Sequence, residues 1–204
     1  PGINSLTPMS EDEQVTRDIL LNEGIAGVVQ VAEAKNLRRA LVITLQLAEM
    51  GLPFLLDLNM ADEAASLGIQ IDQKKLSALL GVPVAETVAI QKRGLKEIRK
   101  GLTALQPATY RHRYPADIEA AVATLCALLP ASRILPRAVA LMILSGDKTL
   151  LEWLQGHLSP DALDRLDQVK TELDRRHNEP LAYRIQKERL RQAEALLQQV
   201  LRQE

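Results

Sequence analysis

The sequence is poor in aromatic residues and cysteine, and it contains no long apolar run. Aromatic residues are 2% of the 204 residues, too few for a stacking surface that binds single-stranded nucleic acid. The single cysteine, Cys126, excludes an internal disulfide and lies among apolar neighbours, as a small buried residue does. The longest uncharged apolar stretch, residues 120–132, is shorter than the roughly 20 residues that cross a bilayer. We therefore expect this segment to be soluble.

The charge balance gives no reason to expect a nucleic-acid or membrane-surface partner. Lys and Arg number 25, Asp and Glu number 26, and the formal net charge is -1, so no excess of basic residues attracts a polyanion. The three histidines, His112, His157 and His177, lack the spacing of metal ligands. A hydrophobic content of 47% is enough to bury the core of one large domain or two small ones.

Short apolar runs alternate with helical patterns in the first half of the chain. A capping box, Ser10 to Glu13, predicts a helix that runs towards Gly24. The predicted strands are residues 26–31, 53–58 and 82–88. The predicted helices are residues 37–50, 63–67, 72–81 and 94–105. Uncharged strands that alternate with helices are typical of a parallel sheet with helices on both faces.

The pattern changes after Pro107, where we place a domain boundary. From Asp117 onward the sequence has no strand candidate. Helices are predicted at residues 117–129, 136–145, 148–157, 160–176 and 181–202, with Ser159 and Pro160 as a typical helix start. We thus predict an α/β domain over residues 1–106 and an all-α domain over residues 107–204.

The second predicted strand ends in a loop that carries Asn59, Met60, Ala61 and Asp62. A carboxylate can accept both the ring N–H and the exocyclic amine of guanine, a pair of donors that adenine does not offer. The asparagine amide can donate to the carbonyl oxygen of the base while its own oxygen holds the loop. Alternatively, Asn59 and Asp62 end a strand and cap the next helix.

Several short matches, in the right order and at the right spacing, resemble FeoB, the prokaryotic ferrous iron transport protein B family. They cover essentially the whole chain and are most specific in its first hundred residues. In that part they are Pro-Gly-x-x-Ser-Leu-Thr-Pro at residues 1–8, Ala-Lys-Asn-Leu-x-Arg at 34–39, Thr-Leu-Gln-Leu at 44–47, Leu-Asn-Met-Ala-Asp-Glu-Ala at 58–64, Gly-Ile-x-Ile-Asp at 68–72, Lys-Leu-Ser at 75–77 and Leu-Gly-Val-Pro-Val at 80–84. In the helical part they are Ala-Leu at 140–141 and Ser-Gly-Asp at 145–147.

The resemblance implies a partial Ras-like P-loop GTPase domain, from the second switch onward, followed by a helical domain of the GDP-stabilising type. It implies that GTP or GDP is the ligand and that residues 59–62 read guanine, with Met60 covering the base where most GTPases have lysine. Val88, Ala89 and Ile90 fall at the last guanine contact of the family, although the usual hydroxyl is missing. Pro1, Gly2 and Ile3 fall at the phosphate contact and the start of the second switch.

The sequence departs from the family pattern in its phosphate-binding elements. It contains no Gly-x-x-x-x-Gly-Lys-Ser/Thr motif, and the threonine of the first switch is also missing. Phosphoryl transfer depends on positioning and charge neutralisation by such groups. We therefore expect an internal fragment that does not hydrolyse GTP by itself, and Mg²⁺ binding only together with a preceding segment.

The resemblance also sets expectations for partners and location. It implies a membrane domain of the same Fe²⁺ transporter as partner and a place at the cytoplasmic face of the inner membrane. The strand at residues 26–31 should have an open edge, so we expect the chain to be marginally stable or to self-associate as a homo-oligomer. The alternative function is a non-catalytic helical protein-interaction module with a remnant α/β domain.

Overall fold

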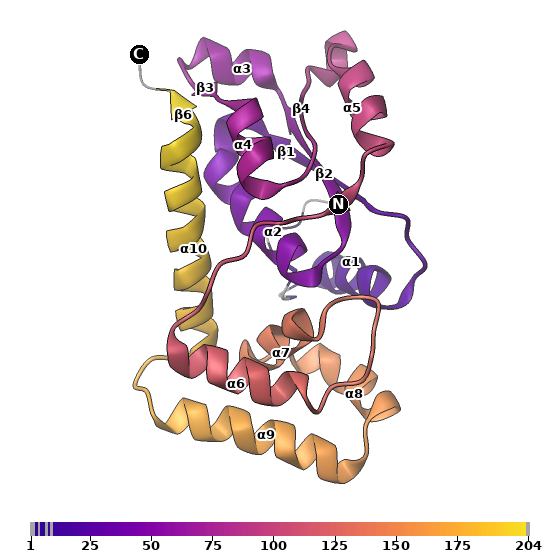
Figure 1. Ribbon diagram of the computed structural model, residues 1–204, viewed down its shortest axis with the longest axis vertical. Coiled ribbons are helices and arrows are strands. Elements are labelled where there is room, and N and C mark those ends of the chain that lie inside the picture. Colours follow the sequence, from indigo (N-terminus) through magenta and orange to yellow (C-terminus); the bar gives the residue numbers. More distant parts are fainter. Residues whose placement is uncertain (1–2, 4, 7, 9, 203–204) are drawn as a thin grey trace. The chain divides into compact units, whose positions relative to one another are not determined.

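The computed structural model describes residues 3, 5, 6, 8 and 10–202 of the chain (Figure 1). The chain forms two compact units, one of residues 1–23 with 112–189 and the other of residues 24–111 with 190–204. Helix α10 (Leu181–Val200) contributes residues to both units. The division of the sequence into residues 1–106 and 107–204 stays a prediction.

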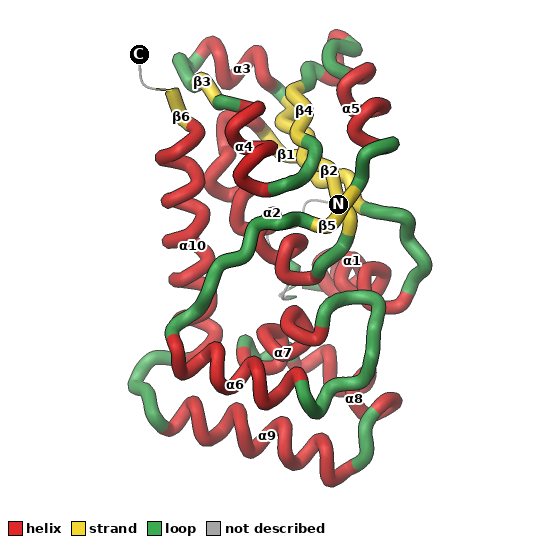
Figure 2. Tube along the Cα trace, in the orientation of Figure 1, coloured by secondary structure: helices red, strands yellow, loops and turns green. Residues whose placement is uncertain are grey.

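A parallel sheet forms the centre of the α/β unit. Its strands β1 (Val28–Glu33), β2 (Pro53–Asn59) and β4 (Val84–Glu86) lie in the order β1-β2-β4, drawn in yellow in Figure 2. Asp57 of β2 is opposite Val31 on one neighbouring strand and Ala85 on the other. The two-residue strand β5 (Gln106–Pro107) pairs antiparallel with the start of β2.

Helices α2, α3, α4 and α5 connect these strands, together with the short turns η1 and η2. Helix α2 is buried along almost its whole length and ends at Gly51. Helix α4 begins at the predicted cap, since the Asp72 carboxylate accepts the Lys75 N–H at 3.0 Å. The bounds are η1 (Ala34–Asn36), α2 (Leu37–Met50), α3 (Ala61–Ser66), α4 (Gln73–Leu80), η2 (Ala89–Gln91) and α5 (Leu95–Leu102). This α/β alternation follows from the apolar runs and helical patterns of the sequence.

Helices α2 and α5 pack on opposite faces of the sheet, as the side-chain alternation of the strands requires. Gln30 of β1 donates to the Ala40 carbonyl of α2 at 2.8 Å and lies opposite Leu56 of β2. Gly101 of α5 packs against Leu55, which points to the other face of β2. Asp57 and Asn59 share the face of Leu55 because they follow it at two-residue intervals.

A second, two-stranded ladder corrects the prediction that no strand follows Asp117. Strand β3 (Gln70–Ile71) pairs antiparallel with β6 (Leu201–Arg202), which comes directly after α10. The predicted last helix therefore ends at Val200 instead of residue 202. The Asp72 N–H donates to the Val200 carbonyl at 2.7 Å. The helical pattern of residues 181–202 cannot reveal this ending, because the partner strand lies about 130 residues earlier in the chain.

Strand β1 is at the edge of the parallel sheet. In the part of the chain that the structure describes, its one strand partner is β2. Val29 and Val31 are also exposed, the second by 62%. An edge strand with exposed apolar residues can pair with another chain. Self-association through this edge stays a prediction.

The helical unit contains α1 and the helices between residues 116 and 189. The two predicted Ser caps are present: Ser10 accepts the Glu13 N–H, and Ser159 accepts the Ala162 N–H. The bounds are α1 (Glu11–Asn22), α6 (Ala116–Cys126), α7 (Pro136–Leu144), η3 (Lys148–Leu150), α8 (Leu151–His157) and α9 (Pro160–Arg175). The core is aliphatic, and nearly all of α7 is buried. No helix of the described residues is both long and apolar enough to span a bilayer.

Candidate functional site: the loops after strands β2 and β4

The loops that follow β2 and β4 lie together at one edge of the sheet. Because the two strands are parallel, their carboxyl ends meet there, which is where ligands bind in open α/β sheets. Backbone hydrogen bonds join the loops: the Ala61 N–H donates to the Thr87 carbonyl at 3.1 Å, and the Thr87 N–H donates to the Leu58 carbonyl at 3.0 Å. The structure thus brings residues 59–62 and 88–90 into one region.

The Asn59 side chain connects the two loops through its oxygen. Asn59 Oδ1 accepts the Ala89 backbone N–H at 3.1 Å and lies 3.2 Å from Thr87 Oγ1. The backbone donor identifies this atom as the oxygen, since an amide nitrogen cannot accept from an N–H. Asn59 Nδ2 makes no hydrogen bond with the described residues. The oxygen therefore anchors the loop, and the amide donor is available to a ligand.

Asp62 is in the first turn of α3 rather than at its cap. Its Oδ2 accepts a hydrogen bond from Gln91 Nε2 at 3.3 Å. The residue at the cap position is Met60, and no side chain forms a capping hydrogen bond there. The alternative interpretation, in which Asn59 and Asp62 cap this helix, therefore lacks its expected contact. Met60 is in the left-handed backbone region, at φ 59°, so the chain turns sharply between the two side chains.

Residues 88–93 form a closed turn beside Asn59. Val88 is buried and pairs with Arg93 in an isolated antiparallel bridge. Ala89 and Ile90, in η2, are exposed, and Ile90 is 90% exposed. Gly94 closes the turn at φ +84°, and a Cβ placed there would come within 2.2 Å of the Glu86 carbonyl oxygen. The turn thus presents an unpaired apolar side chain next to the candidate site.

Two further polar residues lie behind the loops, and neither was predicted to be a site residue. Asp57 and Thr87 are 4% and 1% exposed, and Thr87 Oγ1 donates to Asp57 Oδ1 at 2.8 Å. Burial raises the pKa of the Asp57 carboxyl, and the bond from Thr87 opposes this rise. The available signal was a lone acidic residue in an otherwise apolar strand, two positions before Asn59.

Of the three residues expected near the phosphate, the structure describes Ile3. Pro1 and Gly2 lie outside the described residues, and Ile3 is half-buried in irregular backbone. Their role stays a prediction.

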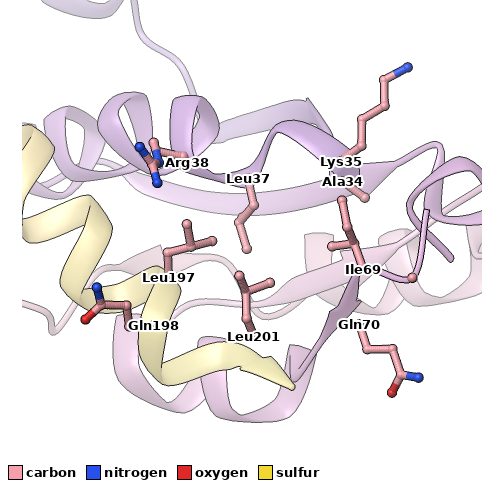
Figure 3. A pocket seen from close by; sticks show the side chains of 10 residues that line it. Ala34, Lys35, Leu37, Arg38, Ile69, Gln70, Leu197, Gln198 and Leu201 are labelled. Atoms are coloured by element: carbon pink, nitrogen blue, oxygen red, sulfur yellow. The ribbon is translucent and has the colours of Figure 1, made fainter. Parts of the chain in front are cut away.

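A separate pocket of about 550 Å³ lies elsewhere in the α/β unit. Figure 3 shows Leu37, Ile69, Leu197 and Leu201 facing one another, while Lys35 and Gln70 point away. The pocket contains none of the residues in the loops after β2 and β4.

Comparisons with known proteins identify relatives along nearly the whole chain. The family model for ferrous iron transport protein B matches residues 1–102, and that for the FeoB cytosolic helical domain matches residues 114–202. The Fe(2+) transporter FeoB of Staphylococcus aureus strain MSSA476 is 29% identical over 98% of this chain, which spans 31% of that relative.

Solved structures show the same fold. A GDP-bound variant of S. thermophilus NFeoB superposes with a TM-score of 0.85 at 28% identity, covering 98% of this chain and 78% of that one. The cytosolic domain of T. maritima FeoB in its GMPPNP form has a TM-score of 0.77 at 25% identity, covering 100% and 78%. These matches confirm the predicted fold class, a partial Ras-like G domain followed by a helical domain. The chain belongs to the FeoB family of ferrous iron transport proteins.

Proposed function

We propose that this chain binds the guanine base of GTP or GDP through the loops after β2 and β4, as the regulatory part of an Fe²⁺ transporter. The observation that carries the proposal is the anchoring of Asn59 Oδ1 by the Ala89 N–H at 3.1 Å. It leaves the amide donor of Asn59 at the same edge of the sheet as the Asp62 carboxylate.

The proposed recognition follows from the donor and acceptor pattern of the base. The Asp62 carboxylate accepts the ring N–H and the exocyclic amine, and Asn59 Nδ2 donates to the carbonyl oxygen. Adenine would present an acceptor where Asp62 needs a donor, so it is rejected. Met60 covers one face of the base with its polarizable thioether. The exposed Ala89 and Ile90 contribute backbone and apolar contacts at the rim.

Relatives support this ligand class. The S. thermophilus NFeoB variant is bound to GDP, and the T. maritima cytosolic domain is in a GMPPNP form. The sequence has no P-loop, so we propose that phosphate and Mg²⁺ are held by a segment outside these 204 residues, near Pro1, Gly2 and Ile3. GTP hydrolysis would then require that segment.

The transport context is also a proposal, because the chain spans less than a third of the S. aureus relative. Fe²⁺ is the cargo of the proposed transporter, and a membrane domain of the same protein carries it. The two units described here would act at the cytoplasmic face of the inner membrane.

Fluorescent GDP titrated into the full chain that the gene encodes tests the proposal. We expect the Asp62→Ala variant to bind on the order of 100-fold more weakly, because two charge-assisted hydrogen bonds are lost. The matched control is Asp167→Ala, at an exposed position of α9, which should bind like the unaltered protein. Equal affinities for both variants would reject the site and favour the alternative, a non-catalytic interaction module.

A further inference from the structure

Asp57 is a buried carboxyl group that the proposed base contacts do not use. It is 4% exposed and lies on the same face of β2 as Asn59, two residues away. The neighbouring strands present Val31 and Ala85 opposite it, and neither side chain can form a hydrogen bond or ionise. A buried carboxyl group without a partner is costly, and Thr87 supplies the partner of Asp57.

The Thr87 hydroxyl lies between two oxygen atoms. Thr87 Oγ1 is 2.8 Å from Asp57 Oδ1 and 3.2 Å from Asn59 Oδ1. A hydroxyl group has a single proton, so it can donate to one of these oxygens at a time. Asn59 Oδ1 is an amide oxygen and can only accept hydrogen bonds, and it already accepts one from the Ala89 N–H. The proton of Thr87 is therefore shared by two competing acceptors.

The ionisation state of Asp57 decides this competition. An ionised Asp57 accepts the Thr87 proton in a charge-assisted bond, so Asn59 Oδ1 faces a lone pair of the hydroxyl. A protonated Asp57 donates a hydrogen bond to Thr87 Oγ1, and the Thr87 hydroxyl then donates its own hydrogen bond to Asn59 Oδ1. The second arrangement gives Asn59 Oδ1 two donors, and it fixes the amide with Nδ2 towards the ligand.

We propose that Asp57 is a positioning residue, which acts through the single proton of Thr87 to set how firmly the Asn59 amide is held for the base. This inference rests on the proposed function, since it assigns Asn59 to the guanine. It adds a proton-linked control of affinity that lies behind the base contacts.

The surroundings of Asp57 favour the protonated form. Burial raises the pKa of this carboxyl more than the Thr87 bond lowers it. Two charged side chains lie on the neighbouring strands. Glu33 accepts a hydrogen bond from Asn36 Nδ2, and Glu86 lies opposite Leu58 instead of opposite Asp57. The charged side chains of α5, at residues 96, 97, 99 and 100, are exposed, and no charged group of the described residues contributes to the pKa shift of Asp57.

The direction of the pH effect follows from the raised pKa. As the pH falls through the pKa of folded Asp57, the protonated arrangement forms and the Asn59 amide is held by two donors. As the pH rises through it, the second donor is lost. Affinity for a guanine nucleotide should therefore be higher below the pKa of folded Asp57 than above it. This pH dependence adds to any that comes from titration of the nucleotide itself.

The first test needs no nucleotide. The side-chain amide resonances of Asn59 are followed by NMR against pH in the full chain that the gene encodes. We expect them to titrate with Asp57 and to become pH-independent in Asp57→Asn, whose new amide can still donate to Thr87 Oγ1. Resonances that do not titrate in the unaltered protein would overturn the inference.

The second test measures affinity for fluorescent GDP across the same pH range. Thr87→Val should bind roughly three- to tenfold more weakly, because it removes one hydrogen bond behind Asn59. Thr87→Ser restores the hydroxyl and should restore the affinity. The matched control is Thr124→Val, whose exposed hydroxyl bonds the Ala120 carbonyl of its own helix and which should bind normally.

The pH profile distinguishes a failure of the proposed function from a failure of the inference about Asp57. Asp57→Asn should bind with the affinity that the unaltered protein has at acidic pH, and should lose the difference between acidic and neutral pH. If Asp62→Ala binds as well as the unaltered protein, the proposed function fails, whatever the NMR titration shows. If Asp62→Ala binds weakly but Asp57→Asn keeps the original pH profile, the inference about Asp57 is wrong.

Discussion

Arg17 and Asp147, which are 130 residues apart in the sequence, form a buried ion pair in the helical unit. The side chains of both residues are 1% exposed, and Arg17 Nη2 also donates to Thr149 Oγ1 at 2.9 Å. Arg17 Nε pairs with the more exposed Asp18 at 2.7 Å. The guanidinium group thus joins α1 to η3 and to the cap residue of η3, Asp147.

Removal of one member of this pair should destabilise the protein strongly. We expect Arg17→Met to lower the free energy of unfolding by about 3–5 kcal/mol, because it leaves the Asp147 charge buried and without its cation. Urea denaturation measures the change. The control is Arg176→Met, which removes an exposed pair with Glu172 at 3.9 Å and should cost less than about 1 kcal/mol. A similar loss for both variants would contradict the role of burial.

Gly94 should tolerate a side chain less well than another glycine of similar backbone geometry. At Gly94, φ is +84° and an added Cβ meets the Glu86 oxygen. At Gly68, φ is +71° and no atom of the described residues lies within 4 Å of an added Cβ. Gly68→Ala should cost about 1 kcal/mol from backbone strain alone. Gly94→Ala should cost more and shift the NMR signals of residues 88–93. Equal losses in denaturation would show that the turn adjusts without cost.

Gln91 should compete weakly with the base for Asp62. Its Nε2 occupies Asp62 Oδ2 at 3.3 Å, and the proposed guanine contact uses both carboxylate oxygens. We expect Gln91→Ala to bind fluorescent GDP about twofold more tightly, because one exposed hydrogen bond no longer has to be broken. Gln168→Ala, at an exposed site of α9, is the control. Weaker binding by Gln91→Ala would mean that this amide orients the carboxylate instead.

The ion pair between Arg137 and Glu119 should contribute an acid-sensitive part of stability. The two terminal guanidinium nitrogens of Arg137, Nη1 and Nη2, donate to the Glu119 carboxylate at 2.7 Å, and this contact lowers the pKa of Glu119. A lowered pKa stabilises the folded state above the ordinary carboxyl pKa, and the contribution is lost as the pH falls through the folded value. Stability should therefore decrease below about pH 4.

Arg137→Met tests this assignment. It should lower the free energy of unfolding at neutral pH by roughly 1–3 kcal/mol and flatten its decline in acid. Arg165→Met, at an exposed position of α9, should leave the pH dependence of stability unchanged. Parallel pH curves for Arg137→Met and the unaltered protein would assign the acid sensitivity to other carboxylates.

Local signals in the sequence were enough to predict most helices and the parallel strands. Asp72, Ser10 and Ser159 all cap helices as predicted, because capping depends on residues only three positions apart. The β3–β6 ladder was missed, since two-residue strands have no periodicity and their pairing is long-range. The contact between Asp57 and Thr87 was missed for a similar reason: it depends on the alignment of two strands, which no local pattern specifies.

The sequence also predicted part of the geometry of the candidate site, whose role stays a proposal. The motif at residues 59–62 indicated both the edge of the sheet and the anchoring role of the Asn59 oxygen, because each follows from side-chain chemistry and strand direction. Gln91 carried no such signal, because it lies 29 residues after Asp62 in the sequence and their contact depends on the conformation of a turn.

The bond from the Ala89 N–H to Asn59 Oδ1 limits how this protein could be re-engineered to accept another base. In the proposed guanine contact, one amide group both fastens a loop and offers the donor, so a substitution at position 59 should change loop structure and base preference together. Among the described residues, the Asp62 side chain makes no comparable bond to the backbone, and its one hydrogen bond comes from the exposed Gln91 side chain. A library that alters base choice without loosening the fold should therefore vary position 62 and keep Asn59.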